Sequence, residues 1–330
     1  MIYMFASHLQ PNLATETPKK APTRAGYGEG LLEAGKRDQN IVALCCDLTE
    51  STKTDAFAKE FPKRFIQIGI AEQNLASVGS GMAAMGKIPF IASYAAFSPG
   101  RNWEQIRTTI AYNNSNVKIV GAHAGISVGP DGATHQMTED LAIMRAMPNM
   151  IVIAPADVHE ARKMTLAVAK HEGPVYFRLG RSDTPTVTTP ESPFTIGKAE
   201  LMYSKTEGRE KNIGIVVTGS LLYNALMTAV ELEKEGLGVS VLHMATIKPL
   251  DTEALLKLAS THTALVTVEE HQIAGGLGSA VAEYLSGVKP TRIERVGIKD
   301  TFGQSGEPDE LIAHYGMDIP AIIEAAKRLI

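Results

Sequence analysis

The feature that most constrains the fold of this chain is a regular alternation of short, β-rich apolar runs with longer amphipathic stretches. The apolar runs lie at 41–44, 88–91, 117–120, 150–153 and 175–177, and the amphipathic stretches at 24–37, 72–85, 101–113 and 157–171. A helix between successive strands lets those strands run parallel in one sheet. The alternation therefore predicts an α/β fold with a mostly parallel sheet.

A stretch rich in proline and threonine, at 183–193, interrupts this pattern because it cannot continue a helix or a central strand. Beyond it the alternation resumes, with apolar runs at 213–217, 239–242, 264–268 and 291–296 and helical stretches near 221–235, 251–260 and 278–286. The sequence thus predicts two α/β domains. We expect an N-terminal arm at 1–20, a first domain at 21–187, a linker at 188–211 and a smaller domain at 212–330.

The composition argues against two classes of protein. The net charge is −4 and the pI is about 6.2, whereas a dedicated nucleic-acid binder is usually more basic. No run of about 18 apolar residues is present, so we expect no membrane-spanning helix. Residues 1–5 lack the basic start and full apolar stretch of a signal peptide. Residues 6–20 read as a loose arm, or as a segment that packs on a partner chain.

The two cysteines, Cys45 and Cys46, are adjacent and follow an apolar run. Adjacent cysteines cannot form an ordinary disulfide staple, so we interpret them as small buried hydrophobic residues. A reducing cytoplasm fits this usage, and no zinc or other metal site is indicated.

The first segment that could carry chemistry is 68–74, where a β-rich run meets Gly69 and then a helix rich in small residues. Glu72 lies at that junction among apolar neighbours. Burial there would favour the protonated carboxyl and let it share a proton with a ligand. The plainer interpretation is a first-turn glutamate stabilised by the helix dipole.

A second candidate is the loop 129–136, which crowds glycines, Asp131 and His135 after the strand at 117–120. His123 lies just upstream. Two imidazoles and a carboxylate near the carboxyl end of a strand suit acid–base work on hydroxyl or carbonyl groups. The alternative is a turn in which Asp131 and His135 bond only backbone groups.

Two further segments suit ligand binding. Arg178 and Arg181 follow a β-run and could hold an anion in bidentate fashion, although a surface salt bridge is the plainer role for one of them. The aromatic segment 90–103 includes Tyr94, Phe97 and the only tryptophan, Trp103. These rings could sandwich a planar ligand, although a core contribution is the commoner explanation.

The second domain offers weaker candidates. The glycine-rich stretch 275–279 opens a helix and could face a phosphate, but it lacks the dinucleotide fingerprint and favours a tight turn. The cluster 269–271, Glu-Glu-His, reads as a solvated strand end. We therefore expect the second domain mainly to stabilise an assembly.

Taken together and in this order, these segments resemble the transketolase family. Residues 69–74, Gly-Ile-Ala-Glu-Gln-Asn, are similar to the family's conserved-glutamate motif, and residues 131–136, Asp-Gly-Ala-Thr-His-Gln, are similar to its sugar-site loop. The resemblance extends from about Arg24 to the C-terminus and is densest between Asp47 and Arg181. Either motif alone is weak, but the pair is specific.

The resemblance implies roles for individual residues around a shared thiamine diphosphate. Glu72 would hydrogen-bond a ring nitrogen of its aminopyrimidine. Ile70, Phe97 and Trp103 would also contact the cofactor, with Phe97 stacked on the ring. The residues implied for the sugar substrate are Ser51, His123, Asp131, His135 and Arg181, of which His123 and His135 would also act in catalysis and Arg181 and Ser51 would hold a sugar phosphate.

The chain departs from the full-length family pattern in one respect. It lacks the Gly-Asp-Gly motif with a downstream Asn that holds the metal and diphosphate, and it has about half the expected length. The resemblance therefore implies a separate N-terminal transketolase subunit that carries the diphosphate-binding domain and Mg²⁺ or Ca²⁺. An assembly with two copies of each subunit, acting on sugar phosphates, is the expected form.

Three alternatives remain open at this point. The chain could be a fragment similar to 1-deoxyxylulose-5-phosphate synthase, which shares the Asp-Gly-x-Thr-His-Gln pattern but is normally one chain. It could be similar to the beta subunit of a 2-oxo acid dehydrogenase, whose corresponding loop lacks that pattern. It could also be a non-catalytic paralogue that only binds a partner, although the joint presence of Glu72, Asp131, His135 and Arg181 disfavours this.

Overall fold

The apolar runs of the first half of the chain form a seven-stranded sheet in the computed structural model, which describes residues 5–330. The order is β12-β6-β7-β5-β4-β2-β3, and every neighbouring pair between β6 and β3 is parallel, as the alternation predicts. The strands are β2 (Ile41–Cys45), β3 (Phe65–Gln67), β4 (Ile88–Tyr94), β5 (Lys118–Ala122), β6 (Ile151–Ile153), β7 (Val175–Arg178) and β12 (Thr246–Lys248).

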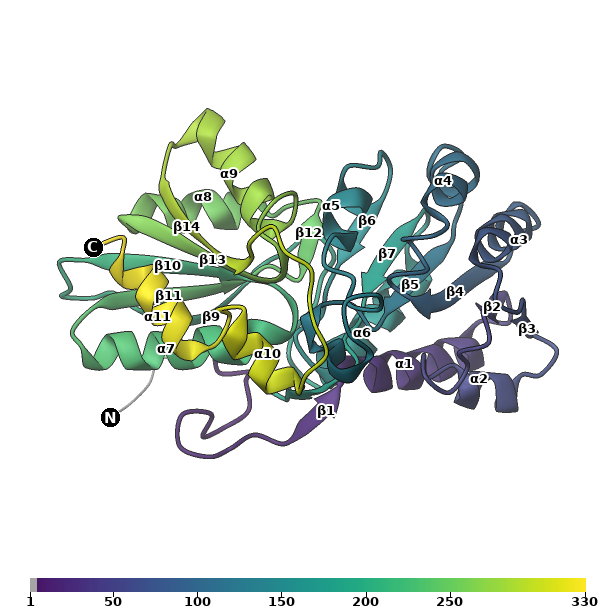
Figure 1. The fold of residues 1–330 in the computed structure, drawn as a ribbon, viewed down its shortest axis with the longest axis horizontal. Helices are drawn as coiled ribbons and strands as arrows, with labels where there is room; N and C mark the ends of the chain where they lie inside the picture. The colour runs from purple at the N-terminus through teal and green to yellow at the C-terminus, as the bar shows by residue number, and fades with distance from the viewer. Residues whose placement is uncertain (1–4) are drawn as a thin grey trace.

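Helices cover both faces of this sheet (Figure 1). One face carries α1 (Thr23–Arg37), α2 (Asp55–Glu60) and α6 (Val158–Lys170). The other carries α3 (Glu72–Ala84), α4 (Trp103–Gln105), the π-helical turn η1 (Ile106–Ala111) and α5 (Asp140–Arg145). Gly26 lets α1 approach α6 closely, because a Cβ there would lie 1.9 Å from the carbonyl oxygen of Val158.

The second half of the chain forms a five-stranded sheet with the order β14-β13-β10-β11-β9. Its strands are β9 (Glu200–Lys205), β10 (Asn212–Val217), β11 (Gly238–His243), β13 (Ala264–Gln272) and β14 (Arg292–Ile298). Its helices are η3 (Gly219–Leu221), α7 (Leu222–Lys234), α8 (Thr252–Thr261), α9 (Leu277–Val288), α10 (Pro308–His314) and α11 (Ile319–Lys327). Helices again lie on both sides of the sheet (Figure 1).

Two strands lie where the sequence pattern does not place them. β9 falls inside the predicted linker 188–211, yet it pairs antiparallel with β11 as an edge strand. β12 belongs to the second half of the chain but pairs antiparallel with β6 at the edge of the first sheet. Both strands lie at edges, and β12 has only three residues while β9 is buried at only two of its six, so neither has the continuous buried run that marks a central strand. Through β12 the two halves share a sheet.

The described part of the N-terminal arm is packed rather than loose. Leu9 and Leu13 are buried among core residues of the second domain. The Ala6 amide donates to Met202 O. The short strand β1 (Lys20–Pro22) pairs with β8 (Asp183–Pro185), which lies in the stretch expected to be irregular. The arm therefore covers this chain's own second domain, and residues 1–4 lie outside the described part.

The acidic cluster of β13 is buried, so the expectation of a solvated strand end was wrong. Both carboxylate oxygens of Glu269 accept amide hydrogens at the start of α9, from Leu277 (2.7 Å) and Gly278 (2.8 Å). The glycine-rich turn therefore presents its helix N-terminus to an internal carboxylate, which leaves those amides unavailable to a phosphate. Burial raises the pKa of Glu269.

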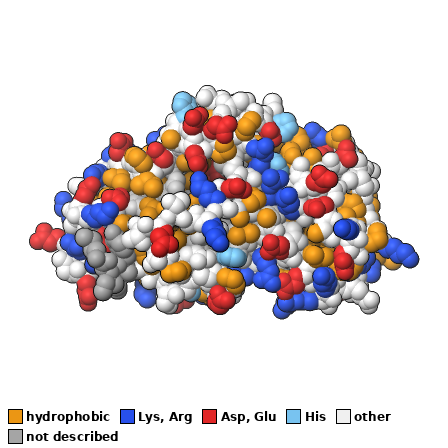
Figure 2. Space-filling view, turned by 90° about the horizontal axis from the view of Figure 1, so that it is seen from below, with side chains coloured by type: hydrophobic (Ala, Val, Ile, Leu, Met, Phe, Trp, Pro, Cys, Tyr) orange, Lys and Arg blue, Asp and Glu red, His pale blue; other side chains and the backbone are white. Residues whose placement is uncertain are grey.

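The two cysteines are buried, as the sequence predicts, and the surface carries side chains of both charges. Cys45 and Cys46 are buried free thiols, and burial raises the pKa of Cys46 to about 12, which keeps it a neutral thiol. Figure 2 shows acidic, basic and apolar side chains interspersed over one face of the molecule. Among residues 5–330, no helix combines the length and apolar character needed to cross a bilayer.

A buried ion pair joins the two domains. Glu160 of α6 and His243 of β11 are 2.9 Å apart, and both are buried. Burial lowers the pKa of His243, but the Glu160 carboxylate more than offsets this and holds it above the ordinary value of 6.5. Burial opposes the ionisation of Glu160, yet His243 holds the pKa of this carboxyl below 4.5.

This pair predicts a pH-dependent free energy of unfolding. Because the folded-state pKa of His243 is raised, its contribution is complete below pH 6.5 and is lost as the pH rises through the folded value. The contribution of Glu160 is lost as the pH falls below 4.5 through its lowered value. We expect denaturant titrations of His243→Gln to show a flatter alkaline limb than the wild type, and an unchanged limb would contradict the assignment.

Candidate active site

Glu72 is the first residue of α3 and is 1% exposed. Its side chain turns back from the helix toward β4, where Ser93 Oγ donates to Oε1 at 3.3 Å. Its backbone carbonyl accepts from Asn102 Nδ2 at 2.9 Å. The carboxylate stands in the first turn of the helix and is withdrawn from solvent in a fixed position. That it shares a proton with a ligand stays a prediction.

A planar cation and an aromatic ring lie against this carboxylate. Arg101 Nη1 is 2.6 Å from Glu72 Oε2. The same guanidinium lies over the ring of Phe97, 4.6 Å from its centroid. Phe97 and Arg101 belong to the segment between β4 and α4. Phe97 was a candidate from the sequence, whereas no motif pointed to Arg101. The structure thus places a buried acceptor beside an aromatic face, with a flat hydrogen-bond donor between them.

From Phe97 a row of rings leads away from Glu72. His135 meets Phe97 edge to face at 5.3 Å, and Tyr94 stacks with Phe97 at 6.0 Å. Tyr94 in turn stacks on His123 at 3.8 Å. The two histidines that the sequence nominated are therefore brought to one site by β4, β5 and the following loop, although their segments alone did not fix that meeting.

His123 is held as a neutral imidazole. Burial, which is the largest cause, and the electrostatic influence of Arg24, Arg181 and His135 together lower its pKa to about 3. Its Nδ1 is buried and has no hydrogen-bond partner among the described residues. Its backbone has φ of +53°, a conformation that non-glycine residues adopt at a cost and that clusters at functional sites. An unpaired ring nitrogen here is available to bond a ligand hydroxyl or phosphate.

Two arginines form the far end of the row. The backbones beside Arg24 and Arg181 are brought together by the hydrogen bond from the Gly180 amide to Thr23 Oγ1 at 2.9 Å. Burial lowers the pKa of Arg24, and the charge of Arg181 lowers it further. Arg24 Nη1 donates to the Ser51 carbonyl at 2.7 Å, and Arg181 Nη1 donates to the Val128 carbonyl at 3.1 Å. Paired guanidiniums that repel one another form a good site for an anion.

Arg24 could not be nominated from the sequence, because it lies far from Arg181 along the chain, in the first turn of α1. Arg178, by contrast, serves the structure, since its guanidinium is buried and bonds Asp140 at 2.9 Å. Arg178 therefore forms a salt bridge, as anticipated for one of the two arginines, but the pair is buried rather than on the surface as expected.

The loop that carries Asp131 and His135 belongs to the first domain but is hydrogen-bonded to the second domain. Gln136, which is buried, donates from Nε2 to the carbonyls of Ile126, Gly129 and Gln304. Gln304 belongs to the segment between β14 and α10. Because one side chain bonds both ends of the loop and the second domain, the position of His135 depends on how the two domains are packed.

The remaining nominated residues lie on the surface near the site. Ile70 is 76% exposed between β3 and α3, and Asp131 is exposed on the short helix η2 (Ile126–Asp131). Trp103 is partly exposed, and its indole nitrogen donates to the Ile143 carbonyl at 3.3 Å. Within residues 5–330, no described contact joins Trp103 to Glu72 or Phe97, so the structure does not bring this tryptophan into the row.

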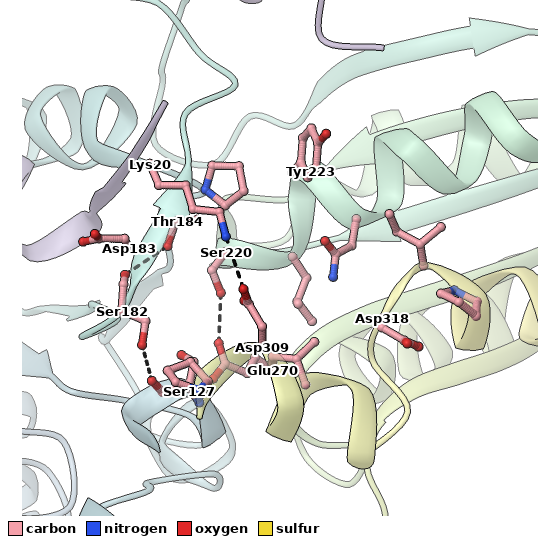
Figure 3. Close-up of a pocket in the computed structure, with 17 residues that line it drawn as sticks. Lys20, Ser127, Ser182, Asp183, Thr184, Ser220, Tyr223, Glu270, Asp309 and Asp318 are labelled. Atoms are coloured by element: carbon pink, nitrogen blue, oxygen red, sulfur yellow. Dashed lines mark hydrogen bonds and ion pairs between the residues drawn. The ribbon is translucent and has the colours of Figure 1, made fainter. Parts of the chain in front are cut away.

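A separate cavity of about 320 Å³ lies at the junction of the two domains (Figure 3). Glu270 lies at its wall and accepts from Ser220 Oγ at 2.9 Å and from the Ser127 amide at 2.6 Å. Lys20 and Asp309 form an ion pair across it at 3.2 Å. None of the nominated site residues lines this cavity, so it is distinct from the row that begins at Glu72.

The side chains of the row suit a ligand with a flat ring at one end and an anionic group at the other. The buried Glu72 carboxylate beside Phe97 fits a flat, nitrogen-containing ring that donates a hydrogen bond, and the arginine pair fits an anionic group at the other end. No cluster of side chains suited to a metal ion occurs in the described part of the chain.

Comparisons with known proteins assign both halves of the chain. Residues 19–186 match the transketolase pyrimidine-binding domain, and residues 203–322 match the transketolase C-terminal domain. A Methanocaldococcus jannaschii protein described as a transketolase C-terminal section is 46% identical and covers 93% of this chain and 94% of its own length. A Clostridium sp. 6-deoxy-6-sulfo-D-fructose transketolase subunit is 40% identical, with 92% of each chain covered.

A solved structure agrees with these matches. A split-gene transketolase, described as an inactive beta4 tetramer, superposes with a TM-score of 0.86 at 44% identity, covering 93% of this chain and 98% of that one. Both domain matches, their order and the identity over nearly the whole length point the same way. The chain belongs to the transketolase family.

Proposed function

We propose that this chain is the pyrimidine-binding subunit of a split transketolase that transfers a two-carbon ketol unit from a ketose phosphate to an aldose phosphate. One observation carries the proposal: a row of side chains in contact runs from the buried Glu72 through Arg101, Phe97 and Tyr94 to His123, and Arg24 and Arg181 lie near enough to His123 to influence its pKa. One end of the row suits the cofactor's ring and the other suits a sugar's anionic group. The match to the M. jannaschii C-terminal section and to the split-gene enzyme supports this reading over the alternatives.

Glu72 and Phe97 would hold the aminopyrimidine of thiamine diphosphate, the cofactor of this family. When bound, this cofactor supplies a carbon nucleophile for the ketose carbonyl and stores the electron pair released on C–C cleavage. Glu72 would accept a hydrogen bond from the ring and hold a proton on it, while Phe97 fixes the plane of the ring. The seclusion of Glu72 keeps water from competing for that bond. Ile70 and Trp103, both at the surface, would contact the cofactor only from its outer side.

The sugar would lie along the rest of the row. His123, held neutral, can accept or donate a hydrogen bond at its unpaired Nδ1 without carrying charge. His135 and Asp131 on the opposing loop would bond hydroxyl groups and move protons to and from them. Arg181, Arg24 and Ser51 would hold the terminal anion. A sugar phosphate and a sugar sulfonate both end in a tetrahedral anion with three terminal oxygens, so this arginine pair also suits a sulfonated sugar, such as the Clostridium relative's name indicates.

The diphosphate end of the cofactor would be held by a separate N-terminal subunit, together with Mg²⁺ or Ca²⁺. The match to a protein described as a transketolase C-terminal section supports this division, and Ile70, exposed beside Glu72, suits a face that the partner covers. We infer a two-plus-two assembly, located in the cytoplasm in view of the free thiols of Cys45 and Cys46.

Reconstitution tests this function. The chain is mixed with the N-terminal subunit, thiamine diphosphate and Mg²⁺, and offered either xylulose 5-phosphate with ribose 5-phosphate or pyruvate with glyceraldehyde 3-phosphate. We expect a seven-carbon ketose phosphate from the first pair and no pyruvate consumption, and no turnover by either subunit alone. Pyruvate consumption without ketol transfer would instead support the synthase alternative, and turnover by this chain alone would refute the division between subunits.

A further inference from the structure

Arg101 fills the space that the proposed function assigns to the cofactor's ring. Its guanidinium is flat, lies 4.6 Å from the Phe97 centroid and donates to Glu72 Oε2 at 2.6 Å. A bound aminopyrimidine would stack on the same ring and donate to the same carboxylate. Both groups cannot occupy one aromatic face and one acceptor at the same time.

We propose that Arg101 is a gate residue that occupies the pyrimidine subsite in the absence of cofactor and must swing outward before the cofactor can enter. This inference rests on the proposed function, since it presumes that Glu72 and Phe97 bind the ring. In the closed position the Arg101 side chain satisfies the buried Glu72 carboxylate, which would otherwise lack a cationic partner. An unpaired buried carboxylate is costly, so the contact stabilises the empty site.

The surroundings of Arg101 allow its side chain to move while its backbone stays in place. The side chain is 48% exposed, whereas that of Glu72 is 1% exposed, so solvent can receive the displaced guanidinium. The neighbouring Asn102 is buried and ties this segment to the Glu72 carbonyl at 2.9 Å and to Ser98 Oγ at 3.2 Å. Opening therefore requires side-chain rotation without unfolding of the turn.

The gate lowers cofactor affinity in a calculable way. If only a fraction of molecules is open, the apparent dissociation constant exceeds the intrinsic one by the inverse of that fraction. Removing the guanidinium opens the subsite in every molecule and leaves the Glu72 carboxylate in need of a donor, which the cofactor supplies. If the closed state is about ten times as populated as the open state, a variant that is always open should bind the cofactor about tenfold more tightly than the wild type.

Calorimetric titration of thiamine diphosphate, with Mg²⁺, into the two-subunit complex tests the gate. Arg101→Met removes the charge and the donors while keeping an unbranched side chain, and we expect it to bind about tenfold tighter than the wild type. Arg101→Lys keeps the charge beside Glu72 but cannot lie flat on Phe97, so its affinity should fall between the two. Arg107→Met, at an exposed arginine of the following π-helical turn, is the matched control and should bind like the wild type.

Equal or weaker binding by Arg101→Met would overturn the gate. If the wild-type complex does not bind thiamine diphosphate at all, both the proposed function and the gate are overturned. If it binds but Arg101→Met does not bind more tightly, only the gate is overturned. If the methionine variant does not fold, as judged by its melting curve, Arg101→Gln takes its place with the same expected direction.

The isolated chain gives a second readout that needs neither the partner nor turnover. The aminopyrimidine alcohol that forms one half of thiamine has no diphosphate, so its binding reports the ring subsite alone. The fluorescence of Trp103, the only tryptophan and two residues from the gate, provides the signal. We expect saturable binding to Arg101→Met at lower ligand concentration than to the wild type, and indistinguishable curves would contradict the gate.

Discussion

Glu72→Gln should reduce ketol transfer by the reconstituted complex by about a hundredfold to ten-thousandfold, the range that general acid–base catalysis contributes. Glutamine has nearly the same shape as glutamate and can still bond Ser93 and the cofactor's ring. It cannot ionise or carry a proton for the ring, so the function of the carboxyl is lost while its volume is kept. Steady-state kinetics at saturating thiamine diphosphate would measure the loss in kcat.

Assembly of the subunits should survive this change, because Glu72 lies inside the chain at 1% exposure rather than at a surface that a partner could touch directly. Analytical ultracentrifugation of the variant with its partner checks this. Glu231→Gln, at an exposed glutamate of α7 in the second domain, is a matched control for the chemical change and should retain full activity. Near-normal turnover in Glu72→Gln would remove Glu72 from the mechanism.

Replacing Arg181 or Arg24 should weaken the binding of a phosphorylated substrate. Hydrogen bonds to charged groups contribute about 1.5–3 kcal/mol, so Arg181→Met should raise KM for a phosphorylated donor by about tenfold to 150-fold. Because the anion is remote from the reacting carbonyl, kcat should change less. Arg24→Met should act in the same direction, and the double variant should fall short of the sum because both residues hold one anion.

The control for this prediction is the substrate. A donor sugar without a terminal phosphate should be equally poor for the wild type and for Arg181→Met, since neither then has an anion to hold. Arg181→Lys keeps a positive charge but loses the bidentate geometry and should be intermediate. A KM that rises equally for phosphorylated and unphosphorylated donors would indicate a distorted site rather than a lost anion contact.

Local chemistry was enough to predict much of this molecule. The apolar runs at 41–44 and 117–120 predicted strands, and their alternation with amphipathic stretches predicted a mostly parallel sheet, which the structure confirms. The glycine before Glu72 and the helix after it identified a strand-to-helix junction, which the structure confirms at β3 and α3. Those inferences needed only neighbours in the chain.

The sequence determined the two-domain α/β layout and nominated Glu72, Phe97, His123 and His135, because strand and helix periodicity and local motifs are properties of short segments. Only the tertiary structure decided that Arg24 joins Arg181, that Arg101 covers Phe97, and that Gln304 supports the loop of His135 through Gln136. The burial of the 269–271 cluster was likewise a tertiary outcome. The physical reason is that charge pairing and burial depend on contacts between segments far apart in the chain, whereas periodicity depends only on residues close together in it.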